Sequence, residues 1–102
     1  MSASRPVIAI TTGDPAGIGP EIVAKAIRDP RVVLACQPVI YGPHTDAELA
    51  PFPAGRVSAA SGRAAYETIV KAVAAVRERR AAALVTAPTN KEALSAAGLE
   101  WK

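Results

Sequence analysis

The stretch VIAITTGDPAGIGPE at residues 7–21 decides the fold, because it predicts a buried strand that leads directly into a helix. Residues 7–12 are mostly apolar and β-branched, which is typical of a strand covered on both faces of a parallel sheet. Glycines and prolines then interrupt the pattern between residues 13 and 20. Pro20 suits the first turn of a helix, where its missing N–H costs nothing, so we expect a helix over 20–27 that ends at Asp29-Pro30.

A second strand and a long helix are expected next. The strand region covers 31–41, and Pro38 limits its regular part to 38–41 or places it at an edge of the sheet, because proline lacks a ladder donor. Residues 42–55 are loop-like, with one helical turn near Glu48. Over 58–80, apolar residues at three- and four-residue steps predict a helix. Its expected core-facing stripe consists of Tyr66, Ile69, Val70, Val73 and either Val76 or Arg77.

A third strand is expected over 81–86, followed by a helix over 91–97. The spacing from Thr89 to Glu92 predicts a capping box at the start of that helix, and Gly98 is its expected C-cap. Strands that alternate with helices indicate parallel pairing through crossovers. The sequence therefore predicts an α/β fold, a parallel-sheet three-layer sandwich.

Composition excludes several classes of protein. The single cysteine, Cys36, rules out a disulfide framework within the chain, and no stretch has the length of a signal peptide core or a membrane span. The net charge is +3, and its one dense cluster, Arg77 to Arg80, falls where the long helix should end and complements the helix dipole. Proteins that bind single-stranded nucleic acid usually place aromatic residues among their basic residues, and no aromatic residues lie among these arginines. We expect a cytoplasmic protein that binds neither nucleic acid nor membrane.

Two loops are candidates for chemistry, because ligands of open α/β sheets gather beyond the carboxyl ends of the strands. Residues 13–19 and 87–90 each open a helix and offer backbone N–H groups to an anion. Lys91 lies at a helix start, where its charge opposes the dipole unless an anion sits opposite. The alternative is that the glycines only permit a tight turn and Lys91 is a solvated surface residue. His44 is the sole histidine and cannot form a metal site alone, so we expect a surface loop residue.

Three strings together resemble blocks of the 4-hydroxythreonine-4-phosphate dehydrogenase family, in the family's order. They are IAITTGDPAGIGPEI at 8–22, SAASGRAAY at 58–66 and LVTAPTNKEAL at 84–94. The resemblance implies a fold like that of isocitrate and isopropylmalate dehydrogenases, with two α/β domains, a cleft between them and a homodimer. It also implies oxidation of a phosphorylated hydroxy-amino acid by NAD or NADP, followed by decarboxylation, in pyridoxal phosphate synthesis. In the family, histidines hold a divalent metal that polarises the substrate.

The resemblance carries site residues over one by one, for binding of substrate or cofactor. They are Asp14, Gly17 and Gly19 in the first loop and Thr86, Asn90 and Lys91 in the second. No catalytic residue and no metal ligand is assigned.

The sequence also departs from the family. A Gly-His-Thr motif and the metal-binding histidines come later in the family and have no match here, and the segment between Tyr41 and Ser58 is much shorter. We therefore expect residues 1–102 to be the N-terminal part of such a dehydrogenase, without its second domain and metal-site region, and inactive alone. Two alternatives are a non-catalytic remnant that binds phosphate or a partner, and a member that acts on another phosphorylated sugar acid.

Overall fold

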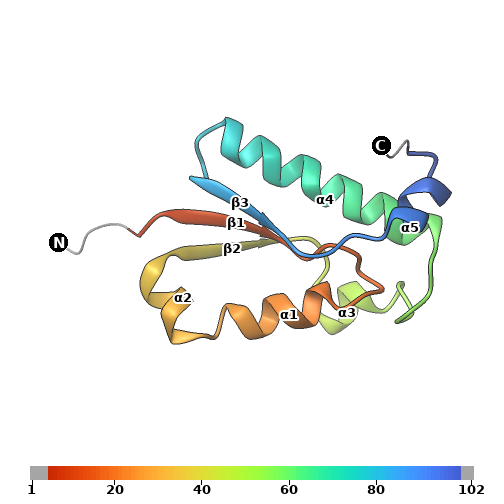
Figure 1. Cartoon of the computed structure of the whole chain (residues 1–102), viewed down its shortest axis with the longest axis horizontal. Helices are drawn as coiled ribbons and strands as arrows, with labels where there is room; N and C mark the ends of the chain where they lie inside the picture. The colour runs from red at the N-terminus through yellow and green to blue at the C-terminus, as the bar shows by residue number, and fades with distance from the viewer. Residues whose placement is uncertain (1–4, 100–102) are drawn as a thin grey trace.

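A parallel sheet of three strands forms the centre of the computed structural model, which describes residues 5–99. The strands lie in the order β2-β1-β3 (Figure 1). β1 (Val7–Thr11) is central and pairs with β2 (Gln37–Tyr41) on one side and β3 (Ala83–Thr86) on the other. Pro38 lies in an outer strand of this sheet, so the predicted edge strand is confirmed.

Helices cover both faces of the sheet, as the predicted sandwich requires. α1 (Gly19–Ala26) and α2 (Pro30–Ala35) lie on one face and α4 (Ala59–Arg77) on the other (Figure 1). α3 (Asp46–Leu49) and α5 (Lys91–Ala96) lie toward the end of the sheet to which the strands point. Within residues 5–99, no helix is long and apolar enough to cross a membrane.

α2 corrects the expectation that a strand region begins at residue 31. The carboxylate of Asp29 caps this helix by accepting the N–H of Arg31 at 2.8 Å, and it also pairs with the Arg31 guanidinium at 2.7 Å. Pro30 fills the first helical position, where no N–H is needed. Asp29-Pro30 therefore starts a second helix as well as following the end of α1.

The side of α4 that packs on the sheet consists mostly of small residues. The predicted core-facing stripe is therefore wrong at Tyr66, Val70 and Val73, whereas Val76 packs against the core as predicted. Tyr66, Val70 and Val73 are 45%, 48% and 39% exposed. The residues that are buried instead recur at three- and four-residue steps on the other face: Ser61, Gly62, Ala65, Thr68, Ala72 and Ala75. Both sets have helical spacing, and the small side chains allow the helix axis to come closer to the strands. Ala9, Ala72, Ala75 and Ala81 form the resulting core.

α5 packs against the start of α4, and the two backbones come close together at Gly62. A Cβ placed on Gly62 would lie 2.0 Å from the carbonyl oxygen of Ala93. The guanidinium of Arg63 reaches over this contact and donates to the carbonyl oxygen of Ala97 at 3.0 Å. This contact fixes where the loop after β3 enters α5, and so places one of the two candidate loops.

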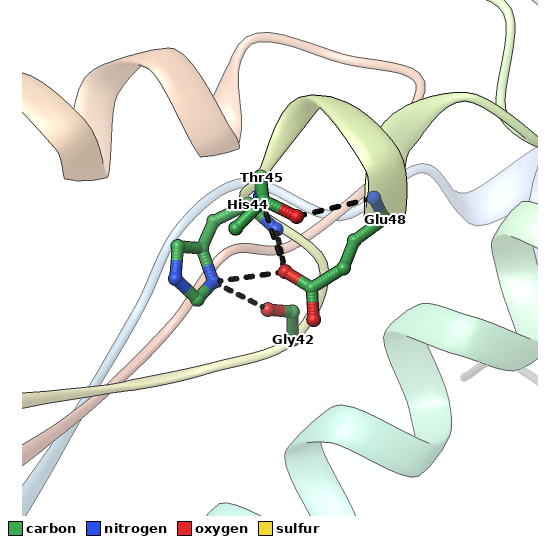
Figure 2. A network of polar contacts seen from close by, with 4 residues as sticks. All are labelled: Gly42, His44, Thr45 and Glu48. Atoms are coloured by element: carbon green, nitrogen blue, oxygen red, sulfur yellow. Dashed lines mark hydrogen bonds and ion pairs between the residues drawn. The ribbon is translucent and has the colours of Figure 1, made fainter.

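A capping network holds α3 in the connection between β2 and α4 (Figure 2). The hydroxyl of Thr45 accepts the N–H of Glu48 at 3.2 Å, and the Glu48 carboxylate accepts the N–H groups of Thr45 at 3.1 Å and His44 at 3.3 Å. The His44 ring lies 3.6 Å from the same carboxylate and 3.0 Å from the carbonyl oxygen of Gly42. His44 is exposed, as predicted. The backbone N–H bonds lower the pKa of Glu48 below its ordinary value.

Replacing Gly62 with alanine should destabilise the protein by about 1–3 kcal/mol, because the added methyl group meets backbone atoms that cannot move aside independently. By helix propensity, alanine in a helix interior is more favourable than glycine. A net loss of stability would therefore come from the steric clash. Urea denaturation gives the free energy of unfolding. The matched control is Gly17→Ala, whose Cβ would lie 3.4 Å from the Asp14 side chain and should change stability by less than about 0.5 kcal/mol. Equal stabilities of the two variants would contradict the close packing of α4 on α5.

Acid should loosen α3 at a pH below the ordinary pKa of a glutamate. Because the folded pKa of Glu48 is lowered, its contribution to stability is present above the unfolded pKa and is lost as pH falls through the folded pKa. NMR pH titration of the His44 and Thr45 amide signals should show this midpoint. Glu48→Gln should abolish the titration, whereas Asp46→Asn in the same turn should leave it in place. A midpoint at or above the ordinary glutamate value would refute the cap.

Candidate functional site

The carboxyl ends of β1 and β3 form a topological switch point. The chain leaving β1 turns to α1 on one face of the sheet, and the chain leaving β3 turns to α5, which packs against α4 on the other face (Figure 1). In open α/β sheets, a ligand crevice forms where neighbouring strands send their connections to opposite faces. The two loops predicted from the sequence therefore meet at the position where such a fold binds its ligand.

Backbone hydrogen bonds join these two loops directly. The N–H of Asp14 donates to the carbonyl oxygen of Pro88 at 3.0 Å, and the N–H of Ala87 donates to that of Thr11 at 3.1 Å. Gly13 makes the approach possible, because a Cβ there would lie 2.2 Å from the Pro88 oxygen and its φ of +71° is left-handed. The first loop is thus held against the second by contacts that do not depend on any charged side chain.

Asp14 shapes the first loop. Its carboxylate accepts the N–H of Ala16 at 2.9 Å and its carbonyl oxygen accepts the N–H of Gly17 at 3.0 Å, which closes a tight turn. Gly19 is also required by packing, since a Cβ there would lie 1.9 Å from the carbonyl oxygen of Thr12. Gly17 is different: it is exposed, and a Cβ would make only ordinary contact with Asp14. Of the two candidate glycines in this loop, only Gly19 has a packing role.

The second loop places its three candidate residues in different settings. Thr86 ends β3 opposite Thr11 and is exposed. Asn90 is half-buried, and its side-chain oxygen accepts the N–H of Ala93 at 2.9 Å, so it is the N-cap of α5. The prediction that Thr89 is the N-cap of this helix is therefore wrong, because the next residue, Asn90, caps it. Lys91 is the first residue of α5 and is exposed at the rim of the switch point.

Two buried hydroxyl groups at this end of β1 had no clear signal in the sequence. Thr11 and Thr12 are fully buried, and their side-chain oxygens have no hydrogen-bond partner within residues 5–99. A Cβ placed on Gly42 would lie 2.4 Å from the Thr12 hydroxyl oxygen, and the N–H of Thr12 donates to the carbonyl oxygen of Tyr41 at 3.0 Å. The end of β2 is thereby locked onto the same edge. Threonine is common in strands, so its presence there did not single out these positions.

The described residues do not fit a resident metal ion. No group of three or more His, Cys, Asp or Glu side chains lies close enough together within residues 5–99 to hold one. His44 is paired with Glu48 alone among such residues. What the site offers is therefore backbone N–H groups, the carboxylate of Asp14 and the positive charge of Lys91 beside exposed, small residues.

Comparison with known proteins identifies the family of the chain. The family model described as pyridoxal phosphate biosynthetic protein PdxA matches residues 18–102. A 4-hydroxythreonine-4-phosphate dehydrogenase of Beijerinckia indica is 36% identical over 128 residues, covering 92% of this chain and 38% of that protein. A D-threonate 4-phosphate dehydrogenase of Cupriavidus necator is 33% identical, covering 96% of this chain and 40% of that protein. These alignments are longer than this chain, so the relatives have a few dozen residues inside the matched region that it lacks.

Solved structures agree with the sequence comparison. The crystal structure of a 4-hydroxythreonine-4-phosphate dehydrogenase from Burkholderia phymatum matches with a TM-score of 0.86 and 28% identity, over 97% of this chain and 41% of that one. A Klebsiella pneumoniae 4-hydroxythreonine-4-phosphate dehydrogenase matches with a TM-score of 0.77 and 30% identity, over 99% of this chain and 42% of that one. The chain thus spans about 40% of the length of the relatives it matches. Because the family model covers most of the chain, the protein belongs to the PdxA family.

Proposed function

We propose that this chain provides a substrate-binding part of a dehydrogenase that oxidises a phosphorylated hydroxy acid. The observation that carries the proposal is the family match over residues 18–102, a range that includes the α1 start and the whole β3–α5 loop at the switch point. The relatives are named for 4-hydroxythreonine 4-phosphate and for D-threonate 4-phosphate. Both names denote a hydroxylated four-carbon compound with a terminal phosphate. The shared chemistry is therefore an anionic group next to an oxidisable alcohol.

The geometry of the switch point suits such an anion. α1 begins there without a side-chain cap, since its N-cap residue Ile18 makes no side-chain hydrogen bond. Although Pro20 has no N–H, the N–H groups of Gly19 and Glu21 in this first turn remain to attract a phosphate. Lys91 adds a full positive charge from the opposite loop. Asp14 holds the first loop in shape through the N–H of Ala16, and this bond keeps its carboxylate engaged within the loop.

A dehydrogenase of this kind uses a nicotinamide coenzyme, NAD or NADP, which accepts the hydride. We include that coenzyme and a homodimeric assembly in the proposal on the strength of the family. The first loop lacks the G-x-G-x-x-G spacing of a dinucleotide fingerprint, so we give its glycines no pyrophosphate-binding role. No group of residues within 5–99 could hold a metal ion, so the proposal gives these residues no metal-binding role.

The names of the relatives point to two candidate substrates, 4-hydroxythreonine 4-phosphate and D-threonate 4-phosphate. Calorimetric titration of the chain with 4-hydroxythreonine 4-phosphate, D-threonate 4-phosphate and their unphosphorylated forms tests this directly. We expect binding of phosphorylated ligands only. Equal affinity for the unphosphorylated forms would refute a phosphate-binding role.

Lys91→Ala should weaken binding of the phosphorylated ligand about tenfold, equivalent to about 1.4 kcal/mol, without lowering the melting temperature. Lys91 is exposed at the first turn of α5, so removing its side chain leaves the core intact. Lys25→Ala is the matched control, because Lys25 is an exposed helical lysine that pairs with Glu21 of α1 at 3.5 Å. Affinities that are the same for wild type, Lys91→Ala and Lys25→Ala would return Lys91 to the role of a solvated surface residue.

A further inference from the structure

The connection between α3 and α4 is fastened to the β1–α1 loop. The N–H of Gly55 donates to the carbonyl oxygen of Ala16 at 2.7 Å. Figure 1 shows this connection in green, running past the end of the sheet to which the strands point, toward α5. The connection therefore forms part of the rim of the switch point, although none of its residues was a candidate from the sequence.

A defined turn sets the position of the residue that follows. The N–H of Arg56 donates to the carbonyl oxygen of Pro53 at 3.2 Å, and Gly55 has a φ of +77°. A left-handed residue at the third position is the signature of a type II turn, which favours glycine there. A Cβ on Gly55 would meet no atom within 4 Å, so the glycine serves the turn and not packing. Arg56 is the last residue of this turn and follows Gly55, which is hydrogen-bonded to Ala16.

Arg56 is unusual among the arginines of the described chain. Four of them have guanidinium partners: Arg5 with the Val33 carbonyl oxygen, Arg31 with Asp29, Arg63 with the Ala97 carbonyl oxygen and Arg80 with Glu78. Arg77 ends α4, and Arg28 and Arg79 follow the C-terminal ends of α1 and α4, at the opposite end of the sheet. Within residues 5–99, Arg56 is thus the one arginine at the carboxyl edge whose exposed guanidinium has no polar partner.

We propose that Arg56 is an anion-binding residue of this site and takes the phosphate of the substrate together with Lys91. The inference deepens the function proposed above and rests on it. A guanidinium presents planar, paired donors that match a phosphate bidentately, whereas the Lys91 ammonium acts as a point charge. The hydrogen bond from Gly55 to Ala16 joins the residue before Arg56 to the loop that contains Asp14.

The test compares Arg56→Ala, Arg56→Lys and Arg28→Ala in the full chain, using calorimetry with 4-hydroxythreonine 4-phosphate and with inorganic phosphate. Arg28 is the matched control, an exposed arginine at the other end of the sheet that has no polar partner among the described residues 5–99. We expect Arg56→Ala to weaken both ligands about tenfold, Arg56→Lys to recover only part of the loss, and Arg28→Ala to bind as wild type. All three should melt at the wild-type temperature. Equal affinity of Arg56→Ala and Arg28→Ala would overturn the assignment.

The outcomes separate this inference from the function it rests on. If Lys91→Ala weakens phosphate binding while Arg56→Ala does not, Arg56 is excluded and the substrate proposal stands. If the wild-type chain does not distinguish phosphorylated from unphosphorylated ligand, both fail. Gly55→Ala keeps the charge but strains the turn, so it should also weaken binding, whereas Gly55→Asn should retain it because asparagine tolerates a left-handed φ. Wild-type affinity in Gly55→Ala would show that the turn does not position Arg56.

Discussion

The backbone contact between the loop after β1 and the loop after β3 is the constraint on which the arrangement of the site depends. The Asp14 N–H bond to Pro88 requires two main chains to touch where a side chain would separate them, and Gly13 satisfies that requirement with a left-handed φ. Gly19 does the same one turn later by letting α1 start against the end of β1. Because both contacts are made by backbone atoms, the shape of the crevice is set by the fold, and the side chains at its rim are free to differ between relatives.

Much of the architecture could be predicted because its signals are local. The β-branched run before Gly13 and Pro20 at the first turn of α1 are readable without knowing what they pack against. The segment at 30–35 was misjudged for the opposite reason. Val32 and Val33 favour a strand by propensity, but the Asp29 cap and Pro30 at the first position favour a helix, and the capping interactions decide the outcome in this short stretch.

The site was only partly predictable for a related reason. Asp14 and Lys91 lie next to glycine, proline and helix-start signals, so their loops could be found by position in the sequence. The sequence does not show whether a polar side chain stabilises the fold or binds a ligand, because its hydrogen-bond partners are often backbone groups. Asn90 caps α5 in this way, and Asp14 closes its own turn. Arg56 could not be selected at all, because its placement depends on a hydrogen bond between residues 16 and 55 that has no counterpart in sequence pattern.

The alanine-rich seam between α4 and the sheet has a consequence for how the sequence can vary. In a core built from large aliphatic side chains, a smaller side chain at one position can be compensated by a larger one at a neighbouring position. The composition of such a core can therefore change while its total volume stays constant. Ala65, Ala72 and Ala75 have no such partner to trade with, since each already carries the smallest side chain that is not glycine and the backbone fills the remaining space. At these three positions packing admits only other small residues such as glycine and serine, while the outer face, with the exposed Tyr66 and Val70, is less restricted by packing. Across related sequences, the positions that look least distinctive are therefore the ones that the fold can least afford to change.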